Sequence, residues 1–239
     1  NPHPVASGWS FEFRNDYYPD TDDTMMVLMA LRFAPPEAVR DEELEPVFRR
    51  ALAWLLSFQC RGGGWAAFDK DVTQWWLENV PFADHNAILD PACSDLTGRM
   101  LELLGYAGFN RGHPAVERAI EHLRRTQEPD GSWYGRWGVN YIYGTWQVLR
   151  GVRSIGEPMD QKWIVRARDW LERCQNEDGG WGETPASYEN PAQGMRREHP
   201  LADRLGRDGA LRVRPDETRF DPSGNPLALG AAEPRRKLG

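Results

Sequence analysis

The sequence has 239 residues, which is enough for one large domain with a substantial core, and its formal net charge at pH 7 is −7. Residues 1–193 carry 19 Lys and Arg against 29 Asp and Glu, a net charge of −10, whereas residues 194–239 carry 10 against 7, a net charge of +3. An acidic body argues against a nucleic-acid partner, because phosphate binding requires clustered Lys and Arg.

The first chemically distinctive segment is an acidic cluster, Asp20, Asp22 and Asp23, just before an apolar stretch. One interpretation is structural, because acidic side chains at a helix N-terminus cap free N–H groups and oppose the helix dipole. The other is a Brønsted acid, because carboxylates packed together cannot all ionise cheaply and the group retains a proton. Such an acid can protonate a carbon–carbon double bond, and aromatic faces can stabilise the resulting carbocation. The 11 Trp, 7 Tyr and 9 Phe could provide such faces, although they suit core packing equally well.

Apolar residues at helical spacing recur along the chain, and strand-like alternation is scarce. They predict helices over Thr24–Phe33, Leu44–Gln59, Ser94–Gly105, Pro114–Gln127, Tyr143–Ile155 and Gln161–Gln175. We therefore predict an all-α fold in which helix pairs repeat around a ring or solenoid, as in an α/α barrel. A plain helical bundle with coincidental glycine turns is the alternative.

Three Gln–Trp segments along this series are internal repeats. Each has five residues between its Gln and its Trp and a Leu four residues before the Gln; the pairs are Gln59 with Trp65, Gln127 with Trp133 and Gln175 with Trp181. An incomplete fourth copy ends at Gly8-Trp9. Glycines within the segments end the preceding helix. The Gln and Trp side chains can then tie that helix end to the next element, which is a structural role.

Metal, disulfide and membrane signals are weak in this chain. Cys60, Cys93 and Cys174 form no CxxC pair, and the five His residues show no ligand spacing. We therefore predict no disulfide framework, no metal site, no cofactor and a reduced, cytoplasmic environment. The chain starts at Asn1 without a leader pattern, and its longest apolar run, Met25–Leu31, is too short to cross a bilayer. Any membrane contact of this stretch is expected to be peripheral.

Several motifs together resemble the squalene–hopene cyclases. Asp-Thr-Asp-Asp-Thr at residues 20–24 matches their DxDDT motif, and the Gln…Gly-x-Trp repeats match their QW motifs. The resemblance runs from about residue 7 to residue 192 and includes GWSFEFRNDYYPDTDDT from Gly8, GGWAAFDKD from Gly63, DHNAILDP from Asp84, DGSWYGRWGVNYIYGT from Asp130 and QNEDGGWGE from Gln175. DxDD alone also occurs in class II diterpene cyclases, and oxidosqualene cyclases share the QW repeats but normally lack DxDD.

The resemblance implies a role for each matching residue. Asp22 would be the proton donor, with Asp20 and Asp23 supporting its acidity, and Asp95 would be a carboxylate behind the acid site. Arg99 stands where some members have a His that hydrogen-bonds the catalytic acid; an Arg would lower the pKa of that acid but could not relay a proton. The implied cavity aromatics are Phe11, Phe68 (where some members have Tyr), Trp137 and Tyr143.

The character of the sequence changes after Gln193. Residues 194–239 contain one aromatic, Phe220, many Arg and Pro and no helical periodicity, a composition typical of disorder. The resemblance predicts instead a glycine-rich turn and a helix reading approximately STPSQTAWAL. Codons for residues 197–208, with the first base of the Gly209 codon, can be chosen so that translation from the second base reads ASTPSQTAWAVM. We therefore expect residues 1–193 to be part of a catalytic α/α-barrel domain and residues 194–239 to lie beyond a frameshift near 193–195.

The resemblance implies acid-initiated polycyclisation of squalene to hopene or hopanol. It covers roughly a third of a complete cyclase, so the isolated chain is expected to be inactive. The parent enzyme is expected to be a homodimer at the cytoplasmic face of a bacterial membrane, bound peripherally through parts outside this stretch. Three alternatives stay open: a class II cyclase of another polyprenyl substrate, a non-catalytic α/α-toroid interaction module, and a prenyltransferase β-subunit relative, whose zinc ligands we do not find.

Overall fold

The structure is a computed structural model, and it describes residues 7–12, 15, 17–35, 40–72, 76, 89–177 and 179–190. Within these residues the chain forms helices and no strand. The elements are α1 (Thr21–Phe33), α2 (Asp41–Ser57), α3 (Ser94–Tyr106), α4 (Pro114–Thr126), α5 (Tyr141–Ser154), α6 (Lys162–Cys174) and the 3-10 turn η3 (Pro185–Tyr188). The predicted all-α class is confirmed, and each predicted helix has a counterpart. The tail predicted to begin at residue 194 lies outside the described residues.

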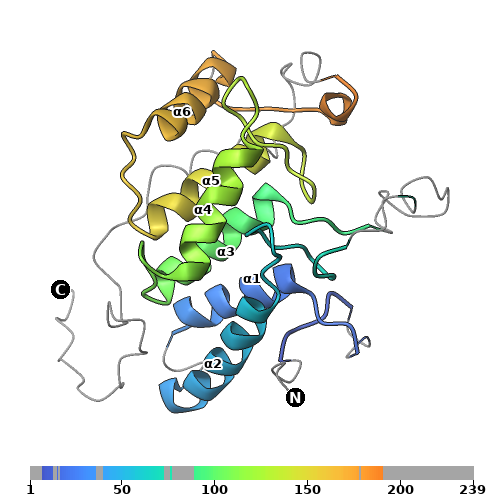
Figure 1. Cartoon of the computed structure of the whole chain (residues 1–239), viewed down its shortest axis with the longest axis vertical. Coiled ribbons are helices and arrows are strands. Elements are labelled where there is room, and N and C mark those ends of the chain that lie inside the picture. The colour runs from blue at the N-terminus through green and yellow to red at the C-terminus, as the bar shows by residue number, and fades with distance from the viewer. Residues whose placement is uncertain are drawn as a thin grey trace.

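The helices are arranged in three successive pairs (Figure 1). The first helices of the pairs, α1, α3 and α5, form a row in which α3 packs between the other two. The second helices pack on their own partners, α2 on α1, α4 on α3 and α6 on α5. This succession of inner and outer helices is the repeat unit of an α/α toroid, and the plain bundle is not needed to explain it.

Glycines bring the backbones of α3 and α5 into direct contact. A Cβ atom placed on Gly151 would lie 2.1 Å from the carbonyl oxygen of Gly98, and one placed on Gly98 would lie 2.7 Å from the carbonyl group of Gln147. Further along, a Cβ on Gly105 would lie 2.4 Å from the Ser154 oxygen. No other residue type fits between these helices without moving them apart.

The three Gln–Trp repeats fold in the same way. The Gln amide donates to the carbonyl oxygen of the glycine four residues later, at 2.8 Å from Gln59, 2.9 Å from Gln127 and 2.7 Å from Gln175. The Trp indole N–H donates to the backbone carbonyl oxygen of the Leu ten residues earlier, at 2.8 Å from Trp65, 2.8 Å from Trp133 and 2.7 Å from Trp181. Each helix end is thus closed by the turn that follows it, which satisfies carbonyl groups that a helix C-terminus leaves unpaired.

The Gln amides also join neighbouring helix pairs. Gln59 donates to Ala115 O at the start of α4, and Gln127 donates to Trp163 O at the start of α6, both at 2.8 Å. The indole rings of Trp133 and Trp163 meet edge to face at 5.9 Å. One side chain therefore closes its own turn and holds the outer helix of the next pair.

Replacing Gln127 with Ala should lower the free energy of unfolding by about 2 kcal/mol, because the two hydrogen bonds that its amide donates, worth ~1 kcal/mol each, are lost, and the exposed bond that its oxygen accepts from Arg166 adds little. The measurement is the urea denaturation midpoint at constant m-value. Glu121→Ala, on the exposed side of α4, is the matched control and should change stability by less than ~0.5 kcal/mol. Equal stability of the two variants would show that the glutamine contacts do not hold the helix pairs together.

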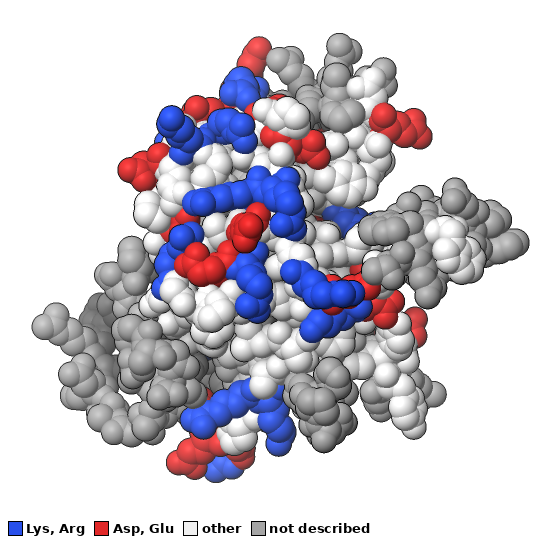
Figure 2. Space-filling view, in the orientation of Figure 1, with Lys and Arg blue, Asp and Glu red and all other residues white. Residues whose placement is uncertain are grey.

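The outer surface of the helix pairs carries interspersed charges (Figure 2). Arg111 pairs with Glu117 and Glu157, at 3.0 Å in each case, and Arg124 pairs with Glu157 at 3.2 Å. The Glu157 side chain is fully buried beneath these two arginines. The arginines around Glu157 therefore neutralise a buried carboxylate of the fold.

Candidate active site

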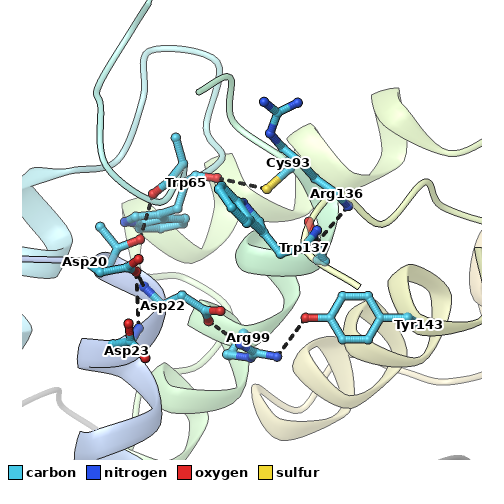
Figure 3. A network of polar contacts seen from close by, with 12 residues as sticks. Asp20, Asp22, Asp23, Trp65, Cys93, Arg99, Arg136, Trp137 and Tyr143 are labelled. Atoms are coloured by element: carbon cyan, nitrogen blue, oxygen red, sulfur yellow. Dashed lines mark hydrogen bonds and ion pairs between the residues drawn. The ribbon is translucent and has the colours of Figure 1, made fainter. Parts of the chain in front are cut away.

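The acidic cluster lies at the N-terminus of α1 (Figure 3). Asp20 is the N-cap, and its Oδ1 accepts hydrogen bonds from the backbone N–H groups of Asp22 at 2.5 Å and Asp23 at 3.2 Å. The structural interpretation of this motif therefore holds for Asp20. The side chains of Asp22 and Asp23 take no part in this cap, so Asp22 is available for another contact.

That contact is with Arg99 of α3. The Arg99 guanidinium donates from Nη1 to Asp22 Oδ1 and from Nη2 to the Tyr143 hydroxyl at 2.9 Å. Figure 3 shows Asp22 and Tyr143 on opposite sides of this arginine. Only 11% of the Arg99 side chain and 25% of the Asp22 side chain are exposed. The three inner helices α1, α3 and α5 therefore meet in one largely buried, charged network.

Burial favours the protonated form of the cluster. It raises the pKa of Asp20 to about 7, although the two backbone N–H groups that this carboxylate accepts from oppose the rise. Burial also raises the pKa of Asp22 and of Asp23, and in both cases Arg99 opposes the rise. The cluster can therefore keep a proton near neutral pH while a cation stabilises the carboxylate that proton transfer would leave behind.

Arg99 itself stays charged in this environment. Burial alone would lower its pKa, but the negative charge of Asp22 and the neighbouring Tyr143 and Asp95 raise it. An arginine with a raised pKa cannot give up a proton at physiological pH. Arg99 therefore contributes a fixed positive charge to the site and not a proton relay.

Asp95 lies behind the site and makes its hydrogen bonds elsewhere. Its side chain is fully buried, and Oδ2 accepts from the backbone N–H groups of Arg136 at 3.0 Å and Trp137 at 2.9 Å. Its influence on Asp22 is through charge, since Asp95 is among the groups that raise the Asp22 pKa. Asp95 therefore holds the Trp137 segment in place as well as acting electrostatically on the acid.

Aromatic rings form a wall next to this network. The ring centroid of Phe68 lies 5.6 Å from that of Tyr18 in a tilted contact and 5.9 Å from that of Trp137 in an edge-to-face contact. The segment before Phe68 is bonded to α1, because Thr21 N donates to Ala67 O at 2.9 Å. Of the predicted cavity aromatics, Phe68 and Trp137 pack together and Tyr143 contacts Arg99. Phe11 is 77% exposed on the segment that precedes α1.

Sequence reasoning missed two polar residues of the site. Asp90 fixes the Phe68 segment, because its Oδ2 accepts from the backbone N–H groups of Phe68 and of Asp69, the latter at 3.1 Å. Gln147 contacts Arg99 from α5, one helical turn after Tyr143. The four-residue spacing from Tyr143 was the available signal, because residues i and i+4 share one helix face.

Two further properties concern the described residues alone. Within them, no group of three His, Cys, Asp or Glu side chains could hold a metal ion. None of the helices α1 to α6 is long and apolar enough to cross a bilayer.

Several known proteins have sequences similar to this chain. The family model for the squalene-hopene cyclase C-terminal domain matches residues 1–203. The chain is 45% identical over 187 residues to the squalene–hopene cyclase of Zymomonas mobilis and 45% identical over 188 residues to a probable squalene–hopene cyclase of Sinorhizobium fredii, with 78% of this chain covered in each case. It is 42% identical over 202 residues, 76% of the chain, to a dammaradiene synthase of Dryopteris crassirhizoma.

These relatives are much longer proteins. The alignments cover 28%, 29% and 29% of their lengths, so the chain spans less than a third of each of them. The family match nevertheless includes the acidic cluster, the Arg99 network and all three complete Gln–Trp repeats. On this evidence the chain belongs to the squalene–hopene cyclase family and represents part of its C-terminal domain.

Proposed function

We propose that the complete protein containing this chain catalyses acid-initiated polycyclisation of squalene to hopene or hopanol. The observation that carries the proposal is the pairing of Asp22, at the N-terminus of α1, with Arg99. The aromatic pair Phe68 and Trp137 is tied to the same site, because Thr21 N of α1 donates to Ala67 O and Trp137 N donates to Asp95. Family membership supports the reaction class, and the named relatives include squalene–hopene cyclases.

Each part of the site has a task in this reaction. The Asp22 carboxyl transfers its proton to a carbon of a terminal double bond of squalene, which leaves a tertiary carbocation and an Asp22 carboxylate. Arg99 stabilises that carboxylate, and neighbouring double bonds then attack the successive cations to close rings. Aromatic faces stabilise these cations without trapping them. Loss of a proton from the last cation gives hopene, and addition of water gives hopanol.

The substrate class leads to the proposed location. Squalene is a hydrocarbon and partitions into lipid, so the complete enzyme must take it from a membrane. We place the enzyme peripherally at the cytoplasmic face of a bacterial membrane, as a homodimer, with the membrane contacts in parts outside the described residues. Shorter or phosphorylated polyprenyls are the alternative substrates, and substrate profiling of the complete enzyme separates them from squalene.

The register of the repeats supports a frameshift after residue 193. Trp9 N donates to Thr24 Oγ1 at 2.8 Å, and Trp65 N donates to Thr97 Oγ1 at 3.1 Å. In these two cases the Thr lies four residues after the N-cap of the next inner helix, whereas Trp133 N donates at 2.9 Å to Thr145, five residues after the N-cap Asn140. The shifted reading Thr-Pro-Ser-Gln-Thr places a Thr at the same position after an N-cap Thr, with Pro first and Gln third as in a capping box. We propose that this helix follows Trp181 in the parent enzyme.

The isolated 239-residue chain should give no cyclised product from squalene, whereas the frame-restored, full-length enzyme should form hopene or hopanol. The reason is solvent access: Phe11 and Tyr18 are 77% and 50% exposed in this chain, and water would quench a cation formed beside them. Sequencing the gene across codons 190–210 defines the frame, and gas chromatography of the products measures activity. A clear cyclised product from the isolated chain would overturn the expectation.

A further inference from the structure

Two side chains of α5 contact the Arg99 guanidinium. Gln147 is 2% exposed, and its amide oxygen, turned toward the donor-only guanidinium, accepts from Arg99 Nε at 3.0 Å and from Nη2. Tyr143, one turn earlier on the same helix face, accepts from Nη2 at 2.9 Å. One edge of the planar guanidinium is thus occupied by α5, and the remaining nitrogen, Nη1, points to Asp22.

The close approach of α3 and α5 at their glycines allows Gln147 to reach Arg99. Gly98 precedes Arg99, and a Cβ at Gly98 would lie 2.7 Å from the carbonyl group of Gln147. The two backbones are therefore in contact beside Arg99 of α3 and Gln147 of α5, which brings these side chains within hydrogen-bond distance. Among the described residues, Gln147 makes no hydrogen bond to Asp22. The two side chains share Arg99 as their hydrogen-bond partner.

We propose that Gln147 is a positioning residue of the acid site, which holds Arg99 in the orientation that pairs with Asp22. This inference rests on the proposed function, since Asp22 is the proton donor there. It assigns to Gln147 an indirect role: without its acceptor, Arg99 keeps only the Tyr143 contact on α5 and can turn away from Asp22. The Asp22 carboxylate would then lose its nearest compensating charge.

The surroundings of Asp22 fix the sign of the expected effect. The titratable and charged groups that face Asp22 among the described residues are the N-cap Asp20, Asp23 on α1, Arg99 and Asp95 on α3 and Tyr143 on α5. Only Arg99 among them is positively charged, and it lowers the Asp22 pKa against burial, which raises it. Weakening the Arg99 contact must therefore raise the pKa of Asp22.

Gln147→Met, which keeps the length of the side chain but removes the strong acceptor, should move the titration midpoint of Asp22 upward by about one pH unit. Gln147→Glu should also move it upward, here through the added negative charge near Asp22, since the new carboxylate still accepts from Arg99. The midpoint is read from the side-chain carboxyl carbon by NMR in the 239-residue chain, with the signal assigned through Asp22→Asn. The readout is a titration, so it does not depend on whether squalene is the substrate.

Two comparisons make the test specific. In an Arg99→Met background, Gln147→Met should leave the Asp22 midpoint where Arg99→Met placed it, because the effect passes through Arg99. Gln161→Met, which replaces a glutamine that contacts Arg124 far from α1, is the matched control and should leave the midpoint unchanged.

In the full-length enzyme the donor must be protonated, so the falling limb of the pH–rate profile should move to higher pH in both Gln147 variants. An unmoved midpoint, or a shift that persists without Arg99, would refute the positioning role.

Discussion

Asp22→Asn in the full-length enzyme should lower kcat for squalene by at least about 10³-fold, within the range that a general acid contributes. An asparagine has nearly the same shape and can still accept the Arg99 hydrogen bond, so the network and the fold should survive. What is lost is the acidic proton, and an amide cannot supply one to a carbon–carbon double bond. The measurement is initial rate of product formation, with the urea midpoint as a check on folding.

Asp23→Asn is the matched control for this substitution. Asp23 lies in the same helical turn and its pKa is also raised by burial, but no hydrogen bond joins its side chain to Arg99 in the described residues. We expect Asp23→Asn to reduce kcat by roughly tenfold, the effect of losing one nearby charge. Equal losses in the two variants would mean that the turn acts as a unit, and undiminished turnover in Asp22→Asn would exclude Asp22 as the donor.

Features that depend on neighbouring residues in the sequence were predictable. The Gln–Trp turns are local, because each closes through hydrogen bonds spanning four or ten residues. Their glycines provide the left-handed backbone that the turn requires, as at Gly131, where φ is 105°. Equal spacing therefore sufficed to predict the turns, the helix ends and the repeated architecture.

Helix starts were less predictable because distant residues help to set them. The apolar pattern placed the start of α5 at Tyr143, but the helix begins at Tyr141. Its N-terminal N–H groups are capped by Glu183, which accepts from Asn140 at 3.2 Å, Tyr141 at 3.1 Å and Ile142 at 2.8 Å. Glu183 lies in the loop that follows the next Gln–Trp repeat, so the sequence near residue 141 gives no sign of this cap. The predicted start of α1, Thr24, was also too late. The helix begins at Thr21, because its first turn consists of polar residues that precede the apolar run.

The site shows the same division between local and distant information. The motif at residues 20–24 indicated the acidic cluster, and the resemblance indicated Asp22 and Arg99 within the site. The partner that orients Arg99 depends on how closely α3 and α5 approach, which is a property of Gly98 and Gly151 together. Neither glycine has a functional side chain, so the sequence pattern did not connect them with the acidic cluster.

This close approach leads to the second large effect. Gly151→Ala should lower the free energy of unfolding by about 2–3 kcal/mol, the usual cost of overpacking, even though Ala gains up to ~1 kcal/mol in helix propensity. The new Cβ would lie 2.1 Å from Gly98 O and 3.0 Å from Gly98 Cα, so α3 and α5 must separate. The measurement is the urea midpoint of the 239-residue chain, with Arg153→Ala on the exposed side of α5 as the matched control.

The same substitution tests whether packing and acidity are coupled. Separating α3 from α5 withdraws Gln147 from Arg99, so the Asp22 titration midpoint should rise in Gly151→Ala as it does in Gln147→Met. Arg153→Ala should change neither stability by more than ~0.5 kcal/mol nor the midpoint. If Gly151→Ala is as stable as the wild type, the helices are not in backbone contact. If it is destabilised without moving the midpoint, the helix contact supports the fold alone and the orientation of Arg99 has another origin.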